Sequence, residues 1–307
     1  MSFEHLPIPN RFFKRWAYFS FRYQRSALTT KTLSAGLTEV QSMLGKLGKW
    51  FSSQQPSDEN ESQPAAPNGR WMSEMLDGHA VHVFDPNTDE KPTGCVMFLH
   101  GHGQVLLNDN AAFTNLLQQY NLVAVCPNGK RSWWMDRICN EFSPDVSPQN
   151  WLVDQLLPFI EERWGIEPPK IAMLGVSMGG QGALQLSFRH AAQFPVVAAI
   201  SPAVDFHQLY GQNLPLDEMF EDIEDARQAT VVLNLHPLAW PRYQWFCCDP
   251  ADTDWFDGCV RLGMKLSSSG ILHERDLDTS AGAHSWDYFN HMAPKAFEHI
   301  AKGLAAY

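Results

Sequence analysis

Short apolar runs alternate with longer amphipathic segments from residue 81 to near the end of the chain. The runs predict buried strands at 81–84, 95–100, 122–126, 170–174, 196–201, 244–248 and 271–277. The segments between them predict helices at 109–120, 150–164, 179–190, 255–269 and 286–303, the last broken or kinked at Pro294. Apolar strands separated by helices are typical of a parallel sheet that is covered on both faces. We therefore expect an α/β three-layer sandwich around a mostly parallel central sheet.

The first 69 residues differ from the rest of the chain in charge and composition. Residues 1–52 hold eight Lys/Arg against two Glu, a net charge of +6. The remaining residues carry a net charge of −17, so the whole chain has a net charge of −11. Apolar residues recur at steps of three and four between positions 33 and 51, so we expect residues 1–51 to form a basic helical extension. Residues 52–69, rich in Ser, Gln and Pro, predict a flexible linker. Residues 70–307 are then the main folded domain.

Basic and aromatic residues gather between positions 11 and 25, which hold five Arg/Lys, seven aromatic residues and no acid. Two interpretations of the segment 11–51 stay open. It packs on the acidic body of its own chain, or it lies on an anionic membrane surface as a peripheral contact. The acidic body lacks the clustered Lys/Arg that phosphate contacts need, so we do not expect nucleic acid as a partner. The oligomeric state is left open.

The six cysteines and the absence of a long apolar run bear on the compartment. The sequence has no CxxC pair, so free buried cysteines are the preferred interpretation and a structural zinc site has little support. The sequence contains no run of about 18 apolar residues, so it predicts no transmembrane helix. It also has no recognisable secretory signal peptide. We expect a cytoplasmic protein, peripheral to a membrane if the basic segment binds lipid.

The sequence GVSMGG (175–180) joins a predicted strand to a predicted helix. In that context, G-x-S-x-G indicates a nucleophile elbow. Gly175 and Gly179 leave out side chains that would clash with the strand and the helix, and the tight turn presents the hydroxyl of Ser177 at the positive end of the helix. The alternative is an incidental serine in a glycine-rich turn, and the position between strand and helix argues against it.

A second glycine-rich turn, HGHG (100–103), ends the predicted strand 95–100. In hydrolases that use an elbow, the turn after the third strand directs a backbone N–H at the substrate oxyanion. We assign this donor to the amide of His102 and the second donor to the amide of Met178. Two histidines two positions apart could also bind a metal, but the sequence offers no convergent acidic or histidine partner.

Three aspartates follow the predicted strand 244–248, and one of them is expected to orient the general base. With an elbow serine, the chain order is serine, acid, histidine. We choose Asp252 because its offset from the strand end matches that of a G-x-x-D turn, with Asp254 second and Asp249 third. For each of them the alternative is a cap of the helix that follows.

His284 lies in the loop before the last predicted helix, where the general base belongs. Its rivals fit the role less well. His273 falls within a predicted strand, and His291 and His299 fall on the last helix, where a solvated or core-edge histidine is ordinary. The prediction is therefore Ser177 as nucleophile, His284 as base and Asp252 as the acid that holds the imidazole.

Two further features bear on substrate access. Residues 204–243 interrupt the alternation of strands and helices and are a candidate lid over the strand ends. Five tryptophans near predicted strand ends are candidates for an apolar acyl or aryl pocket, with core or lid packing as the alternative for each: Trp133, Trp134, Trp245, Trp255 and Trp286.

Four motifs together, GVSMGGQGAL, HGHGQ, CCDPADTDWF and AGAHSWDYF, resemble the esterase family that includes esterase D and S-formylglutathione hydrolase. The resemblance covers roughly residues 80–305 and implies an α/β-hydrolase fold. It places Ser177, Asp252 and His284 at the family's triad positions and implies a serine esterase or thioesterase that needs no cofactor. The family also includes mycolyltransferases and enterochelin esterases. The first 70 residues and the region 204–243 depart from the glutathione-thioester enzymes.

The leading functional hypothesis is hydrolysis of a small carboxylic ester, or of a thioester, through an acyl-enzyme on Ser177. The first alternative is acyl transfer to an alcohol through the same acyl-enzyme, and a peptidase is another. A non-catalytic binding module on a hydrolase scaffold would require a broken triad, and all three residue types are present in order.

Overall fold

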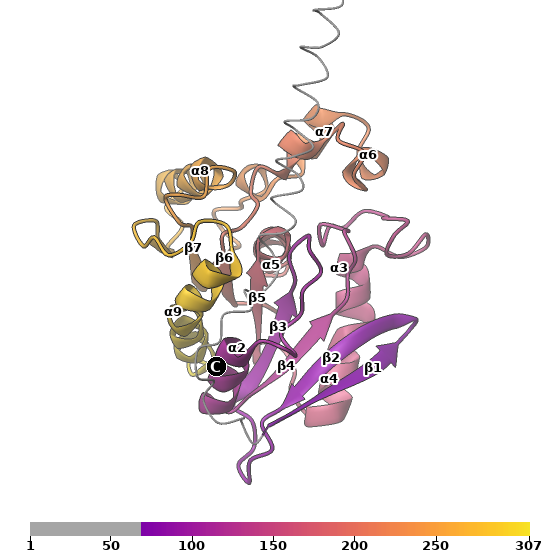
Figure 1. Cartoon of the computed structure of the whole chain (residues 1–307), viewed down its shortest axis with the longest axis vertical. Coiled ribbons are helices and arrows are strands. Elements are labelled where there is room, and N and C mark those ends of the chain that lie inside the picture. The colour runs from indigo at the N-terminus through magenta and orange to yellow at the C-terminus, as the bar shows by residue number, and fades with distance from the viewer. Residues whose placement is uncertain (1–68) are drawn as a thin grey trace, which may run out of the picture. The chain divides into compact units, whose positions relative to one another are not determined.

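The computed structural model describes residues 69–307, so the predicted extension 1–51 and nearly all of the predicted linker lie outside the described residues. An eight-stranded sheet runs through this part of the chain in the order β1-β2-β4-β3-β5-β6-β7-β8 (Figure 1). Only β1–β2 and β2–β4 pair antiparallel, and the remaining neighbours are parallel. The strands are β1 (Arg70–Leu76), β2 (His79–Asp85), β3 (Gly94–Leu99), β4 (Leu122–Pro127), β5 (Ile171–Val176), β6 (Val196–Ile200), β7 (Tyr243–Cys247) and β8 (Glu274–Asp276).

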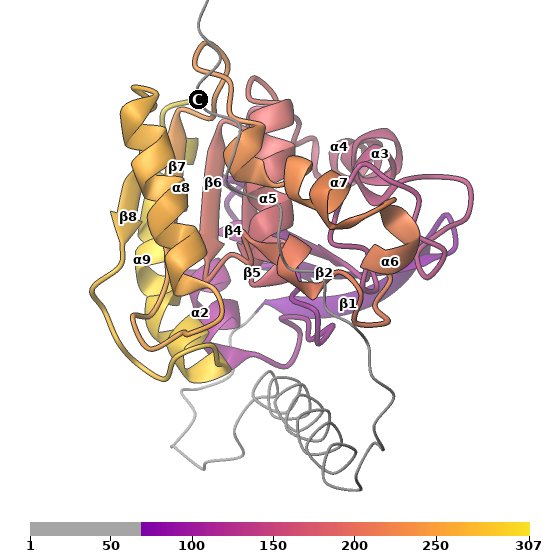
Figure 2. The ribbon, with the colours of Figure 1, turned by 90° about the horizontal axis from the view of Figure 1, so that it is seen from above.

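Helices cover both faces of the sheet (Figure 2). One face carries α2 (Ala111–Gln119) and α9 (Trp286–Leu304). The other carries α3 (Pro148–Trp151), the π-helical turn η1 (Leu152–Leu156), α4 (Leu157–Trp164), α5 (Met178–Arg189) and α8 (Phe256–Ser268). The mostly parallel three-layer sandwich that the sequence predicts is confirmed.

Alternation along the buried strands divides the apolar residues between two cores. In β3, Cys95, Met97 and Leu99 belong to the core under α4, α5 and α8, whereas Val96 and Phe98 belong to the core under α2 and α9. Successive side chains of a strand point to opposite faces, so a run of entirely apolar residues fills both cores at once.

Three predicted elements differ in the structure. The strand predicted at 271–277 is confined to β8 (Glu274–Asp276), so His273 precedes the strand and does not lie within it. The last helix continues through Pro294 without a break, although proline cannot donate the helical hydrogen bond to residue 290. The helix predicted at 150–164 contains a π-helical turn, in which the Leu157 amide bonds the Leu152 carbonyl just ahead of Pro158.

The segment between β6 and β7 contains short helices: η2 (Phe206–Leu209), α6 (Leu216–Met219), α7 (Ile223–Gln228) and η3 (Val231–Leu233). Its apolar residues, Phe206 and Phe220 among them, join the core on the α5 side. Arg137, in the loop after β4, holds the segment from outside, because its guanidinium bonds Asp225 at 2.7 Å and lies 4.5 Å from the ring centroid of Phe220. The segment is packed into this layer, and its role as a lid stays a prediction.

Within residues 69–307, none of the helices has the length and hydropathy needed to cross a membrane. All six cysteines of the chain lie in this range, and all are buried and free, as the sequence predicts.

Candidate active site

Ser177 occupies the sharp turn between β5 and α5. Its backbone angles, φ 55° and ψ −121°, lie in a region that residues other than glycine rarely adopt. A Cβ on Gly175 would overlap the backbone of Gly179, and one on Gly179 would overlap the carbonyl oxygen of Leu99. The turn therefore closes only with glycines two positions before and after the serine.

The structure brings three of the predicted site residues into one hydrogen-bonded line. His284 Nε2 lies 2.9 Å from Ser177 Oγ, and His284 Nδ1 lies 2.7 Å from Asp252 Oδ2. Because the carboxylate can only accept, Nδ1 carries the proton, and Nε2 is free to accept from the serine hydroxyl. Ser177 is fully buried, and Asp252 and His284 are 2% and 8% exposed. Water therefore competes little for these bonds.

The three candidate acids end up in different places. Asp252 faces His284, and its second oxygen accepts the amides of Asp254 and Trp255 at the start of α8. The side chain of Asp254 is exposed. Asp249 is fully buried and binds the loop that carries His284, not the imidazole itself. The Cys248 thiol adds a contact to Asp252 Oδ2 at 3.5 Å, which no local pattern in the sequence indicates.

The other histidines that could have served as base lie away from Ser177. His273 donates to the Ile271 carbonyl at 3.0 Å and stacks on Phe246. His291 is exposed on α9. His299 is buried near Glu274, and its burial lowers its pKa. Of the four candidate histidines, only His284 bonds both a serine and a carboxylate.

The two amides assigned to an oxyanion hole belong to neighbouring turns. Met178 is the first residue of α5, so its N–H has no acceptor within the helix. His102 lies in the turn that follows β3. The close approach of Gly179 to the carbonyls of Leu99 and His100 holds the start of α5 against this turn. The turns that carry Met178 and His102 therefore lie against each other, and the role of their amides as an oxyanion hole stays a prediction.

His100 supports the turn through its side chain. The Gly129 amide donates to His100 Nε2 at 3.0 Å, so Nδ1 carries the proton and donates to the Gly101 carbonyl at 2.7 Å. The Trp134 indole donates to the His100 carbonyl at 3.0 Å. Burial lowers the pKa of His100 to about 4, which keeps the imidazole neutral and able to accept. This histidine braces the turns after β3 and β4, a role that its position beside His102 does not reveal.

The five tryptophans proposed for a pocket are all core side chains, at most 5% exposed. Trp245 and Trp286 pack in the core under α9, away from the α5 face. Trp255 and Trp133 pack beside predicted site residues, with ring centroids 6.4 Å from that of His284 and 5.9 Å from that of His102, respectively. Core packing thus accounts for all five, and two of them pack beside predicted site residues.

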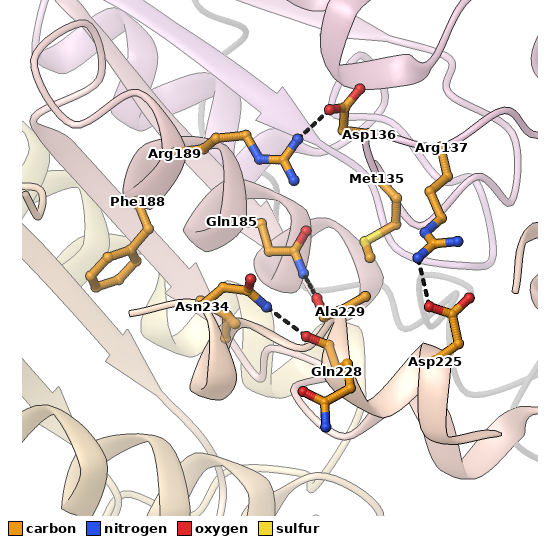
Figure 3. Close-up of a pocket in the computed structure, with 11 residues that line it drawn as sticks. Met135, Asp136, Arg137, Gln185, Phe188, Arg189, Asp225, Gln228, Ala229 and Asn234 are labelled. Atoms are coloured by element: carbon orange, nitrogen blue, oxygen red, sulfur yellow. Dashed lines mark hydrogen bonds and ion pairs between the residues drawn. The ribbon is translucent and has the colours of Figure 1, made fainter. Parts of the chain in front are cut away.

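A cavity of about 530 Å³ lies further along α5 and contains none of the predicted site residues (Figure 3). Gln185 and Arg189 line it from α5, two and three turns beyond Ser177. Ion pairs of Arg189 with Asp136 and of Arg137 with Asp225 cross its walls. Across residues 69–307, no three His, Cys, Asp or Glu side chains gather in a way that could hold a metal ion.

The sheet order, the elbow and the Ser–His–Asp line define a hydrolase of the α/β-hydrolase fold. A family model described as "Putative esterase" matches residues 75–254, and the chain belongs to this esterase family. The match covers Ser177 and Asp252 and ends before His284. The protein is accordingly a carboxylic ester hydrolase.

Three known proteins illustrate the similarity. An acetyl esterase from Caldicellulosiruptor saccharolyticus is 22% identical over 248 residues, which cover 71% of this chain and 87% of that protein. The structure of a ferulic acid esterase aligns with a TM-score of 0.62 at 16% identity, over 76% of this chain and 99% of the other. The S-formylglutathione hydrolase from Agrobacterium tumefaciens aligns with a TM-score of 0.62 at 18% identity, over 79% and 98%.

Proposed function

We propose that the protein hydrolyses its ester through an acyl-enzyme on Ser177, with His284 as general base and Asp252 as the acid that orients it. The observation that carries this proposal is the pair of distances at the imidazole, 2.9 Å to Ser177 Oγ and 2.7 Å to Asp252 Oδ2. A serine hydroxyl is a weak nucleophile until an adjacent base accepts its proton.

The reaction follows from these contacts. Ser177 Oγ attacks the ester carbonyl carbon while its proton passes to His284 Nε2, and Asp252 stabilises the imidazolium that forms. The amides of Met178 and His102 donate to the tetrahedral oxyanion. The carbon–oxygen bond to the alcohol then breaks, and His284 returns the proton to the leaving alkoxide. Water attacks the acyl-enzyme through the same groups, which releases the acid and restores Ser177.

For the acyl group, a short chain is the first choice. The similar acetyl esterase gives one reason for it. The burial of Ser177 and His284 gives another, because a small acyl group needs the least room beside a serine that is fully buried. A thioester would react by the same steps with a thiolate as leaving group, and the similar S-formylglutathione hydrolase makes it the second substrate to test. The compartment in which the protein works is proposed to be the cytoplasm.

The test is a fluorophosphonate label combined with the Ser177→Ala variant. We expect the wild-type protein to take up one label, on the peptide that contains Ser177, and to hydrolyse p-nitrophenyl acetate. Ser177→Ala should lose the label and at least about 10⁴-fold of kcat, because removal of the nucleophile removes the acyl-enzyme route. Near-native turnover in a folded Ser177→Ala protein would show that another group attacks the ester.

A further inference from the structure

Asp249 is a second fully buried carboxylate at the site, and the proposed chemistry does not use it. Both of its oxygens are occupied by donors. Oδ1 accepts the Ala251 amide and the Ser280 hydroxyl, each at 2.8 Å. Oδ2 accepts the amides of Ala281 and Ala283 at 2.7 and 2.8 Å. Three of these four donors belong to the loop that leads directly into His284.

That loop has a backbone conformation that it would not adopt unaided. Gly282 has φ 115° and Ala283 has φ 57°, so two consecutive residues lie at positive φ. A Cβ on Gly282 would come within 2.9 Å of Ser285 Oγ. Residues in such sparsely populated regions persist only where the surrounding structure fixes them. The bonds from Ala281 and Ala283 to Asp249 Oδ2 fix the backbone on either side of Gly282.

Asp249 also shapes the turn that carries the other partner of His284. Its carbonyl accepts the amide of Asp252 at 2.9 Å, while its side chain accepts the amide of Ala251. Asp249 therefore holds both the turn that carries Asp252 and the loop that carries His284. These two segments lie 32 positions apart in the chain, and the bond between Asp252 and His284 depends on how they are placed relative to each other.

We propose that Asp249 is a positioning residue, whose carboxylate holds the 280–283 loop so that His284 meets both Asp252 and Ser177. The inference rests on the proposed function of that triad. Burial alone would raise the pKa of Asp249, but the four hydrogen bonds outweigh burial and lower it, so the carboxylate stays ionised at neutral pH. An ionised carboxylate offers only acceptors, which matches a set of four donors.

Asp249→Asn tests the proposal with little change in volume. The amide places an NH₂ group where one oxygen stood, against either the Ala281 and Ala283 amides or the donors of Oδ1. We expect kcat for p-nitrophenyl acetate and the rate of fluorophosphonate inactivation to fall together by about 10- to 100-fold, because a displacement of about 1 Å at the base costs that much. KM should change by less than about threefold. Hydrogen exchange of the 278–286 peptide should become faster.

Asp254→Asn is the matched control, since it makes the same change on an exposed side chain of the same turn, and it should keep both rates. A purely structural role of Asp249 would lower the melting temperature of Asp249→Asn and leave both rates of the folded protein near wild type, which overturns the inference. If Asp249→Asn does not fold, Ser280→Ala decides, because it removes a hydroxyl that donates to Asp249 Oδ1 and is itself an exposed residue. Both rates falling together by at least about threefold support positioning, and unchanged rates overturn it.

Ser177→Ala distinguishes a failure of the proposed catalytic function from a failure of the proposed role of Asp249. Turnover retained by Ser177→Ala would overturn the proposed function and, with it, the role of Asp249. An inactive Ser177→Ala protein beside an Asp249→Asn protein with both rates within about twofold of wild type would overturn the role of Asp249 alone.

Discussion

At the scale of single residues, the site is decided by which of several identical side chains meets His284. Asp249, Asp252 and Asp254 lie within six positions of one another and have the same chemistry. Asp252 bonds the imidazole, Asp249 bonds the loop behind it, and Asp254 points to solvent. Each position therefore carries its own expected cost on substitution.

Asp252→Asn should lower kcat for p-nitrophenyl acetate by on the order of 10⁴-fold, because the amide can no longer hold Nδ1–H and stabilise the imidazolium. Asp254→Asn should stay within about twofold of wild type. Steady-state kinetics on both variants, with circular dichroism as the check of folding, makes the comparison. A loss in Asp254→Asn that equals the loss in Asp252→Asn would mean that the acid has been assigned to the wrong residue.

At the scale of elements, the site lies where β3, β5 and β7 end. Parallel strands have their carboxyl ends at one edge of the sheet, and the turn at 100–103, Ser177 and Asp252 follow three of those ends. His100 braces this edge by linking the turn after β3 to the turn after β4. The bond from the Gly129 amide needs a neutral His100 imidazole, so the stability that this bond contributes depends on pH.

The free energy of unfolding should fall as the pH is lowered from 6.5 towards about 4. His100 has a pKa of about 4 in the folded protein against 6.5 when unperturbed, so the unfolded chain binds the extra proton in this window. Between pH 7.5 and pH 5, His100 alone contributes about 2 kcal/mol to this loss.

Urea unfolding of the wild type and of His100→Gln at those two pH values checks this expectation. Gln can still accept from the Gly129 amide but does not titrate. The variant should therefore lose less stability between pH 7.5 and pH 5 than the wild type does. An equal loss in both proteins would place the pH dependence in other groups, such as the buried His299.

At the scale of the whole molecule, charge divides the chain into a segment of +6 up to residue 52 and a remainder of −17. All the proposed catalytic residues lie between positions 102 and 284. The described fold begins at Gly69, whose amide donates to Gln118 Oε1 at 2.7 Å and whose Cα lies against Phe84. A shortened chain must therefore keep Gly69.

A chain that begins at Asn68 should retain wild-type kcat and KM for p-nitrophenyl acetate. If the basic segment docks on its own acidic body, the shortened chain should melt at a lower temperature. If it contacts a membrane, the melting temperature should hold and sedimentation with anionic vesicles should be lost, since each Lys/Arg near the lipid contributes about 1 kcal/mol. A folded, shortened chain without turnover would show that residues 1–67 take part in catalysis.

The sequence by itself determined the layered sheet, the elbow and the loop of the base. Apolar runs indicate strands that are buried on both faces of the sheet. The glycines around Ser177 indicate a tight turn in which no larger residue fits at those positions. These signals are local, because each depends on residues within a few positions of one another. Even so, the antiparallel β1 went unpredicted, since this edge strand mixes polar and apolar residues and contains no buried residue.

The tertiary structure alone decided which contacts form between distant segments. The offset from the strand end favours Asp252 in the sequence, but the bonds that separate its role from that of Asp249 depend on how the turn after β7 lies against a loop about 30 residues later. The hydrogen bonds of His100 and of Asp249 likewise join segments that no local pattern connects. The burial of all five tryptophans also depends on how distant segments pack together. Hydrogen bonds across the edge of a sheet follow from strand order and loop path, and neither is encoded within a single stretch of residues.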